Sequence, residues 1–213
     1  MTRMVAADRR EDIIEAATRV LLRKGVSAAT TRDVTAEIGV GVGLLSHYFG
    51  WADLRAAAFE RIVRSDLERS LIGRAHEPAT AVMTDLLTQA FETQFDPIWR
   101  VWIEASDLAT TDAALATCVH DCSHLWQTSL RDLWARGASD GMWTCADPDG
   151  ASWRLMAIIY GLAGLALVPN AMLSRDGASA HLSVMVRNEC DWTMRRKPGL
   201  NPKDRTLKGL VRR

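Results

Sequence analysis

The sequence predicts an all-α protein, and three observations support this prediction. Apolar residues recur at helical spacing along most of its 213 residues, and glycine and proline fall between the periodic segments. No segment alternates in the way expected of a half-buried strand. The apolar share of 48% is ordinary for a globular protein with a buried core. We therefore expect an N-terminal three-helix head with a helix-turn-helix, followed by a larger helical body.

The first helix is predicted from about Asp8 to Lys24, where a basic last turn is followed by Gly25 as the C-cap. Its apolar face consists of Ile13, Ala16, Ala17, Val20 and Leu21.

The segment from Thr30 to Leu54 predicts two short helices joined by a tight turn. Thr31 is a suitable N-cap for a helix that runs through Val34 and Ile38, and Gly39 can take the positive φ of a helix end. A second helix is predicted over Val42–Tyr48, with Gly41 as a weaker N-cap and with Leu45 and Phe49 turned inward. Two helices joined so closely commonly place the second one in a DNA major groove.

This segment allows two other interpretations. Glycine turns are common between helices, so the segment could simply be core helices with no role at DNA. The run Gly39–Gly43 follows a helix and fits neither nucleotide-binding fingerprint, which excludes a phosphate loop.

Six further helices are predicted at about 52–72, 79–94, 98–108, 112–136, 150–172 and 178–194, with a loop over 137–150. The inward residues of the helix over 52–72 are Leu54, Ala58, Ile62 and Leu67. We expect three parts: a DNA-binding domain over 1–51, a body over 52–194 and a flexible tail over 195–213.

Charge is unevenly distributed along a chain whose formal net charge is zero. Residues 1–72 carry 11 basic and 10 acidic residues (+1), residues 73–194 carry 7 and 15 (−8), and residues 195–213 carry 8 and 1 (+7). The acidic block and basic tail bear on partners and not on fold.

No apolar run is long enough for a membrane span, and the N-terminus lacks a secretory h-region. The four cysteines have no framework spacing, which indicates a reduced, cytoplasmic protein.

The run from Thr31 to Val40, followed by Gly43, Leu45, Tyr48 and Phe49, resembles the DNA-binding domain of TetR-type transcriptional repressors. Leu45–Gly50 is similar to the choline-responsive, BetI-type branch. The resemblance is strong over about residues 9–60, and Trp99, Trp102 and the helix around Gly161–Leu167 are compatible with that branch's ligand domain.

The resemblance implies a homodimer of helical subunits whose body binds a small-molecule effector and thereby releases a palindromic DNA operator. By position, the resemblance assigns contacts with DNA bases or with the DNA backbone to seven residues: Thr31, Arg32, Gly41, Val42, Gly43, His47 and Tyr48. Gly41 stands where the family often has Ser, and Ser46 stands where it often has Tyr, so two hydroxyl donors that could reach phosphate are lost. The lysine that contacts phosphate in the family is absent beside Trp51, so we expect affinity to depend on Arg3, Arg9, Arg10 or the basic tail.

Six of the eight tryptophans lie between positions 99 and 153. Tryptophans with nearby carboxylates suit a quaternary ammonium ion or another cation, although such residues are often core. The candidate ligand residues are Trp99, Trp102, Glu104, Trp126, Trp134 and Tyr160; Asp107, Asp121 and Asp132 are further possible acids.

Cys118, His120, Cys122 and His124 alternate, but on a helix the two cysteines and the two histidines lie on different faces. We therefore expect no metal site, and no cofactor motif or catalytic nucleophile–base pair stands out; thiol sensing by the two cysteines stays open.

The helix around Gly161 and Gly164 is apolar almost all round, which favours a four-helix dimer interface or burial within one subunit. The apolar residues of this set are Leu155, Ile158, Ile159, Leu162, Leu165, Ala166, Val168, Leu182, Met185 and Val186.

The sequence thus favours a ligand-responsive transcriptional regulator and not an enzyme, with double-stranded DNA, a small molecule and a second copy of the chain as partners. One alternative is a helical ligand-binding or scaffold protein whose DNA head has decayed. Another is a non-specific DNA binder that acts through the basic tail.

Overall fold

The computed structural model describes residues 2–190, with side chains from residue 8 onward. Arg3 and the predicted tail at 195–213 lie outside these described side chains. The described part is helical and contains no β-strand, which confirms the predicted fold class. None of its helices is both long enough and apolar enough to cross a membrane.

The chain divides into two compact units, and each is built from two separate stretches of sequence. The first unit comprises residues 1–69 and 94–126, and the second comprises 70–93 and 127–213. The long helix α7 (Ala113–Ser139) contributes its first half to one unit and its second half to the other.

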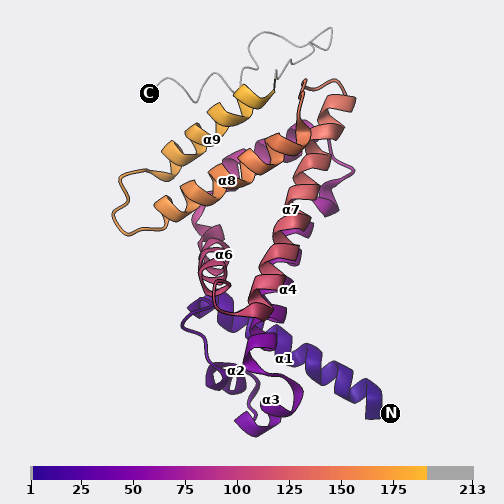
Figure 1. Cartoon of the computed structure of the whole chain (residues 1–213), viewed down its shortest axis with the longest axis vertical. Helices are drawn as coiled ribbons and strands as arrows, with labels where there is room; N and C mark the ends of the chain where they lie inside the picture. The colour runs from indigo at the N-terminus through magenta and orange to yellow at the C-terminus, as the bar shows by residue number, and fades with distance from the viewer. Residues whose placement is uncertain (1, 191–213) are drawn as a thin grey trace. The chain divides into compact units, whose positions relative to one another are not determined.

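The first unit begins with α1 (Thr2–Lys24), α2 (Thr31–Ile38), α3 (Val42–Tyr48) and α4 (Trp51–Ser70), and it also contains α6 (Asp96–Leu108). Helix α2 packs against both α1 and α3, and Figure 1 shows α2 and α3 side by side. Every residue predicted to face inward from the first helix is fully buried, as are Leu45 and Leu54. Apolar periodicity therefore located the core of the head correctly.

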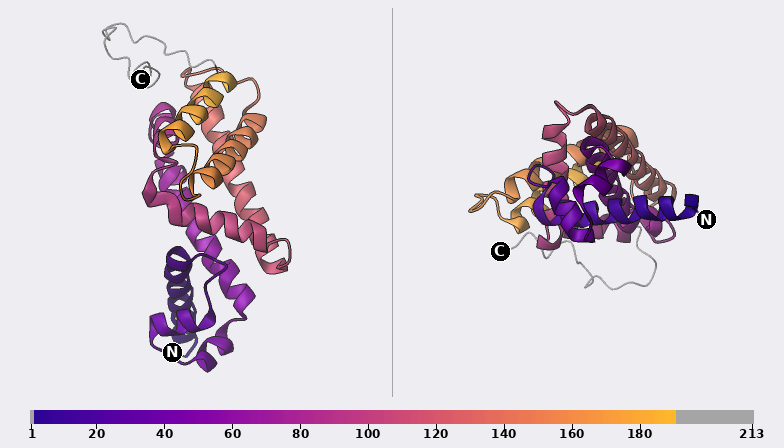
Figure 2. Two further views of the ribbon diagram at one scale, coloured as in Figure 1. Left: turned by 90° about the vertical axis from the view of Figure 1, so that its left-hand side faces the viewer. Right: turned by 90° about the horizontal axis from the view of Figure 1, so that it is seen from below.

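The second unit contains the 3-10 helix η1 (Ile72–Arg74), α5 (Ala79–Gln89), α8 (Pro148–Ala166) and α9 (Arg175–Glu189). A second 3-10 helix, η2 (Thr93–Phe95), lies where the chain passes from this unit to the first. Helices α8 and α9 lie side by side in Figures 1 and 2, and α9 also packs on α5.

Several helix ends differ from the sequence prediction. The α1 helix begins at Thr2 and not near Asp8, and α5 ends at Gln89 and not near 94. The α8 helix ends at Ala166, six residues before the predicted end, because Pro169 cannot continue a helical hydrogen-bond pattern.

The predicted loop over 137–150 was too long at its start, since α7 continues to Ser139. Gly137 lies inside this helix, and the ring of Trp143 occupies the space that a side chain would need there: a Cβ atom at Gly137 would lie 1.9 Å from the ring. The indole nitrogen of Trp143 donates to the carbonyl of Trp134 at 2.9 Å. This contact fixes the loop against the end of α7.

Candidate nucleic-acid interface and body residues

The start of α2 is fixed by a capping box one residue earlier than predicted. Thr30 is the N-cap: its hydroxyl accepts from the Asp33 amide at 3.3 Å, and the Asp33 carboxylate accepts from the Thr30 amide at 3.0 Å. At the other end Gly39 has φ +69° and its amide donates to the Thr35 carbonyl. The predicted glycine cap is therefore confirmed, and it turns the chain directly into α3.

The α3 helix is held mainly by its packing, because its N-cap Gly41 has no side chain to satisfy the first amides. Leu45 and Phe49 are buried, as predicted. Arg10 of α1 donates from Nη1 to the Tyr48 carbonyl at 2.8 Å, and its guanidinium carbon lies 4.1 Å from the centre of the Phe49 ring. Arg10 thus fixes the carboxyl end of α3.

Ion pairs join α1 to α2. Lys24 lies 2.5 Å from the Asp33 carboxylate, while Arg19 and Arg23 contact Glu37 at 3.0 and 2.9 Å. Lys24 and the Thr30 hydroxyl lower the pKa of Asp33, and the two arginines lower the pKa of Glu37.

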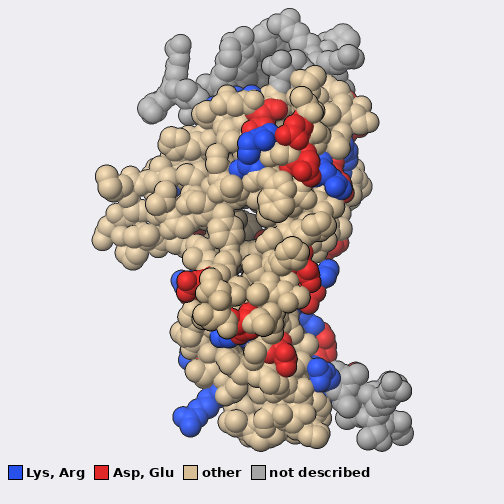
Figure 3. All heavy atoms as spheres, in the orientation of Figure 1, with Lys and Arg blue, Asp and Glu red and all other residues tan. Residues whose placement is uncertain are grey.

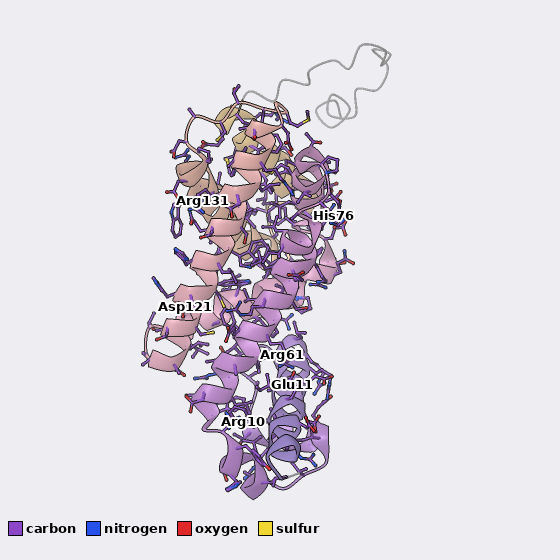
Figure 4. All side chains as sticks on the ribbon, turned by 90° about the vertical axis from the view of Figure 1, so that its right-hand side faces the viewer. Arg10, Glu11, Arg61, His76, Asp121 and Arg131 are labelled. Atoms are coloured by element: carbon purple, nitrogen blue, oxygen red, sulfur yellow. The ribbon has the colours of Figure 1, made fainter. Side chains whose placement is uncertain are left out.

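Another ion pair joins α1 to α4. Arg61 Nη1 lies 2.5 Å from Glu11 Oε1, and the two side chains point toward one another in Figure 4. These cations therefore have carboxylate partners that position the short helices.

The opposite face of α3 is open to solvent. Gly41, Val42, Gly43 and His47 are exposed, and Tyr48 is half-buried. The Tyr48 and His47 rings pack edge-on, with their centres 5.4 Å apart. On α2, Arg32 is exposed and Thr31 is half-buried. The seven sequence-predicted DNA residues thus lie at the accessible parts of α2, α3 and the turn between them.

Sequence reasoning missed one residue of this face. Leu44 is an exposed apolar side chain on α3, beside the buried Leu45. The helical phase could have found it, since Leu44 and Leu45 differ by about 100° and cannot both face the core.

Four of the six candidate ligand residues belong to the first unit. Trp102 is buried and packs edge-on against Phe59 of α4, with ring centres 5.1 Å apart. Trp99 and Trp126 are half-buried, and the indole nitrogen of Trp126 is buried without a hydrogen-bond acceptor among the described residues. Buried donors of this kind call for an explanation.

Glu104, the fourth candidate, contacts the loop after α1. Its carboxylate accepts from the Ser27 amide at 2.8 Å, and it fills the space beside Gly25, whose φ is +87°. Glu104 therefore joins α6 to the loop that precedes α2.

The other two candidates, Trp134 and Tyr160, belong to the second unit. Trp134 is fully buried and packs edge-on with Trp143, with ring centres 5.8 Å apart. Its indole nitrogen has no acceptor among the described residues either. Tyr160 is half-buried on α8.

A buried carboxylate on α4 was also missed. Asp66 lies on the same buried face as Phe59, Ile62 and Leu67, and it pairs with Arg69 at 3.0 Å. Burial raises the pKa of Asp66, and Arg69 opposes part of that effect. An acid on the apolar face of a helix is a signal that the sequence already carried.

The Cys118–His124 segment lies on α7 as predicted, with its two residue types on different sides. Cys122 is buried and Cys118 donates to the Ala56 carbonyl at 3.4 Å, whereas His120 and His124 are exposed. Within the described residues no group of three or more histidine, cysteine or acidic side chains could hold a metal ion.

Comparisons with known proteins agree with this arrangement. A family model described as "Bacterial regulatory proteins, tetR family" matches residues 13–50, and one described as "BetI-type transcriptional repressor, C-terminal" matches residues 78–191. The HTH-type transcriptional regulator PksA of Bacillus subtilis (strain 168) is 27% identical over 188 residues, which cover 85% of this chain and 90% of PksA.

Solved structures share the fold at low sequence identity. A regulator from Saccharomonospora viridis in complex with choline has a TM-score of 0.70 at 22% identity and covers 86% of this chain and 98% of its own. A TetR-family regulator from Cytophaga hutchinsonii has a TM-score of 0.72 at 15% identity, covering 86% of this chain and 96% of its own.

The BetI-type model alone spans more than half of the chain, and the tetR model covers the helix-turn-helix whose geometry is described above. The chain is therefore a member of the TetR family of transcriptional regulators, with an N-terminal helix-turn-helix and a BetI-type repressor domain.

Proposed function

We propose that this regulator binds a palindromic operator as a homodimer and leaves it when a small-molecule effector binds its body. One observation carries the DNA part of the proposal: α3 buries Leu45 and Phe49 while it exposes Val42, Gly43 and His47. A recognition helix requires this combination of a firmly packed inner face and a free outer face.

The described head offers fewer groups for contacts to DNA phosphates than the family pattern does. Arg19, Arg23 and Lys24 are engaged by α2, and α3 itself contains no lysine or arginine. Arg32, with Thr31 and Tyr48, is one exposed group on the described head that can contact the DNA backbone. We therefore propose that the basic tail adds salt-dependent affinity without choosing the sequence.

A dimer interface is proposed on the outer side of α8 and α9. Leu155, Ile159, Leu182, Met185 and Val186 are buried within the subunit, which accounts for part of the predicted apolar set. Of the rest, Leu165 and Val168 are exposed, whereas Ile158, Leu162 and Ala166 are half-buried. Leu165 and Val168 lie at helical spacing with the exposed Trp153, Ala157 and Gly161 and form an exposed stripe on α8 and just after it, and Val184 is exposed on α9. Apolar stripes of this kind mark interaction surfaces.

The charge distribution of these helices agrees with an interface. In Figure 3 the part formed by α8, α9 and their connection shows mostly uncharged side chains on the visible face. A Cβ atom at Gly161 would meet nothing within 4 Å in the subunit, so the glycine is not required by the subunit's own packing.

Gly161→Leu tests the interface. Inside one subunit the new side chain is tolerated and favours the helix, but it would hold a second copy away. We expect the substitution to weaken the dimer at least tenfold in sedimentation equilibrium, as should Leu165→Glu. The matched control is Ala135→Leu, at an exposed helical position on α7. An intact dimer in both stripe variants would show that another surface dimerises.

For the effector, the proposal favours a cation. The tryptophans at 99, 102 and 126 share the first unit with the buried Asp66, and an aromatic site beside a carboxylate suits a quaternary ammonium ion. The related regulator from Saccharomonospora viridis was solved with choline. Trp134 and Tyr160 remain candidates in the second unit.

Tryptophan fluorescence would test this proposal with choline and its neutral carbon isostere, 3,3-dimethylbutanol. A cation site predicts that choline binds at least tenfold more tightly and that Asp66→Asn removes most of this preference. Glu68→Gln, an exposed acid on the same helix as Asp66, is the control. Equal binding of both probes would exclude a site selective for cations.

Selection from random duplex DNA at near-physiological salt tests the function as a whole. A specific regulator should recover one palindrome whose half-sites lie about one helical turn or more apart. Deletion of residues 195–213 should then lower affinity and reduce its salt dependence, while the sequence preference stays. Recovery of no consensus would favour the scaffold alternative, and loss of all binding with the tail would favour the non-specific one.

A further inference from the structure

The exposed face of α3 is unusually apolar for a surface that meets DNA. Val42 is 46% exposed and Leu44 is 39% exposed, and both are hydrophobic. Between them, Gly43 has no side chain, and a Cβ atom there would meet nothing within 4 Å. The surface therefore consists of two apolar side chains on either side of bare backbone.

The composition of α3 excludes the usual polar contacts to bases. Its sequence, VGLLSHY, contains none of the arginine, lysine, asparagine or glutamine side chains that pair with two atoms of guanine or adenine. Ser46 bonds back to the Gly43 carbonyl at 3.0 Å, which occupies its hydroxyl proton. Direct hydrogen bonds from α3 are thus left mainly to His47 and the Tyr48 hydroxyl.

One feature of the major groove is apolar and distinguishes a base. Thymine carries a C5 methyl group there, and side chains such as alanine or phenylalanine recognise it by van der Waals contact. The gap at Gly43 allows the helix to approach closely enough for short apolar side chains to reach the base edges.

We propose that Val42 and Leu44 read thymine methyl groups, so that each operator half-site contains at least one thymine contacted by each side chain. This inference rests on the proposed operator binding. It adds the chemical class of base that the site prefers and names Leu44 as a determinant of specificity.

The test removes single methyl groups from the DNA and leaves the protein unchanged. In the palindrome recovered by selection, each thymine is replaced in turn by deoxyuridine, which pairs identically but lacks the C5 methyl. At the contacted positions we expect affinity to fall about fourfold for each methyl and about fifteenfold when both half-sites are changed. Replacing such a thymine by cytosine should weaken binding, and 5-methylcytosine should recover part of the loss.

Protein variants assign the contacts. With Val42→Ala or Leu44→Ala, the preference for thymine over deoxyuridine should disappear at the position that each side chain contacts, because the two changes remove the same interaction. Both residues are exposed, so these changes leave the core intact. Ser46→Ala, on the same short helix, is the matched control and should keep the full preference.

The outcomes separate this inference from the proposed function. A specific palindrome whose affinity is insensitive to every deoxyuridine substitution, or whose sensitivity survives both alanine variants, overturns the inference and leaves operator binding in place. Failure to recover any palindrome overturns both. A methyl effect that Val42→Ala and Leu44→Ala remove, and that Ser46→Ala keeps, supports the inference.

Discussion

The contact between Glu104 and the loop after α1 yields the sharpest stability prediction for this protein. The Glu104 carboxylate accepts from the Ser27 amide at 2.8 Å and lies beside Gly25, two residues earlier. A net hydrogen bond to a charged group contributes about 1.5–3 kcal/mol, and half-burial places this one toward the lower end. Glu104→Ala should therefore lower the free energy of unfolding by about 1.5–2 kcal/mol.

A second substitution tests the same contact from the other side. Gly25 has φ +87°, which costs other residues about 1 kcal/mol or more, and a Cβ atom there would lie 2.5 Å from the Glu104 carboxylate. Gly25→Ala should therefore incur the backbone cost and also displace Glu104. Because both variants lose the same hydrogen bond, the double variant should be less destabilised than the sum by about 1.5–2 kcal/mol.

Urea unfolding of the four proteins measures this coupling, with Glu68→Gln, an exposed acid on α4, as the control. A further substitution, Glu104→Gln, decides between two roles for Glu104. If Glu104 fixes the loop, Glu104→Gln should weaken operator binding and leave effector affinity unchanged. Additive destabilisation, or a loss of effector affinity at full stability, would refute this reasoning.

Three further predictions follow from the described contacts. Arg10→Gln should weaken binding to all DNA sequences about threefold to tenfold in gel shifts, because the carboxyl end of α3 loses its link to α1. Iodoacetamide should modify Cys118 before Cys122 by mass spectrometry, since the Cys122 thiol lowers the pKa of Cys118, while Cys118 and burial raise that of Cys122. In urea melts, Asp66→Asn should become more stable relative to wild type as pH rises from about 4 to 7. The pKa of Asp66 is raised in the folded protein, so the protonated carboxyl group stabilises the wild type below its unfolded pKa of about 3.9. The wild type loses this contribution as the group ionises at higher pH.

Each of these predictions has a result that would contradict it. Arg64, which pairs with Glu60 on its own helix, is the control for Arg10, and an equal loss in Arg64→Gln would point to general charge effects. Faster labelling of Cys122 would mean that this side of α7 opens in solution. A constant difference between wild type and Asp66→Asn from pH 4 to 7 would show that Asp66 titrates normally.

Local sequence signals were sufficient for the helices of the head and their inward faces. The C-cap at Gly39 and the burial of Leu45 and Phe49 depend on residues that are neighbours in the chain. The N-cap was placed one residue late because Thr30 and Thr31 have equal intrinsic preference. Only the reciprocal bonds between Thr30 and Asp33 decide between them.

The contacts that position the candidate sites were not predictable in this way. Arg10 reaches Tyr48 across 38 residues, and Glu104 reaches Ser27 across 77. Helical periodicity gives the face on which a side chain lies but not the element that packs there. For that reason a glutamate near two tryptophans was interpreted as a candidate ligand, although in the fold it binds a loop amide.

The weak caps of α3 explain why these distant contacts matter. A helix of seven residues is marginal on its own, and this one has a glycine N-cap and a second glycine in its first turn. Its position must therefore come from the burial of Leu45 and Phe49, from its packing on α2, and from Arg10 of α1. Weakening the contacts between α1 and α3 should therefore alter DNA affinity, even if none of the described cations of α1 contacts DNA. The two glycines that weaken α3 also leave its outer face free of bulk, so the same residues that lower local stability allow Val42 and Leu44 to approach the bases.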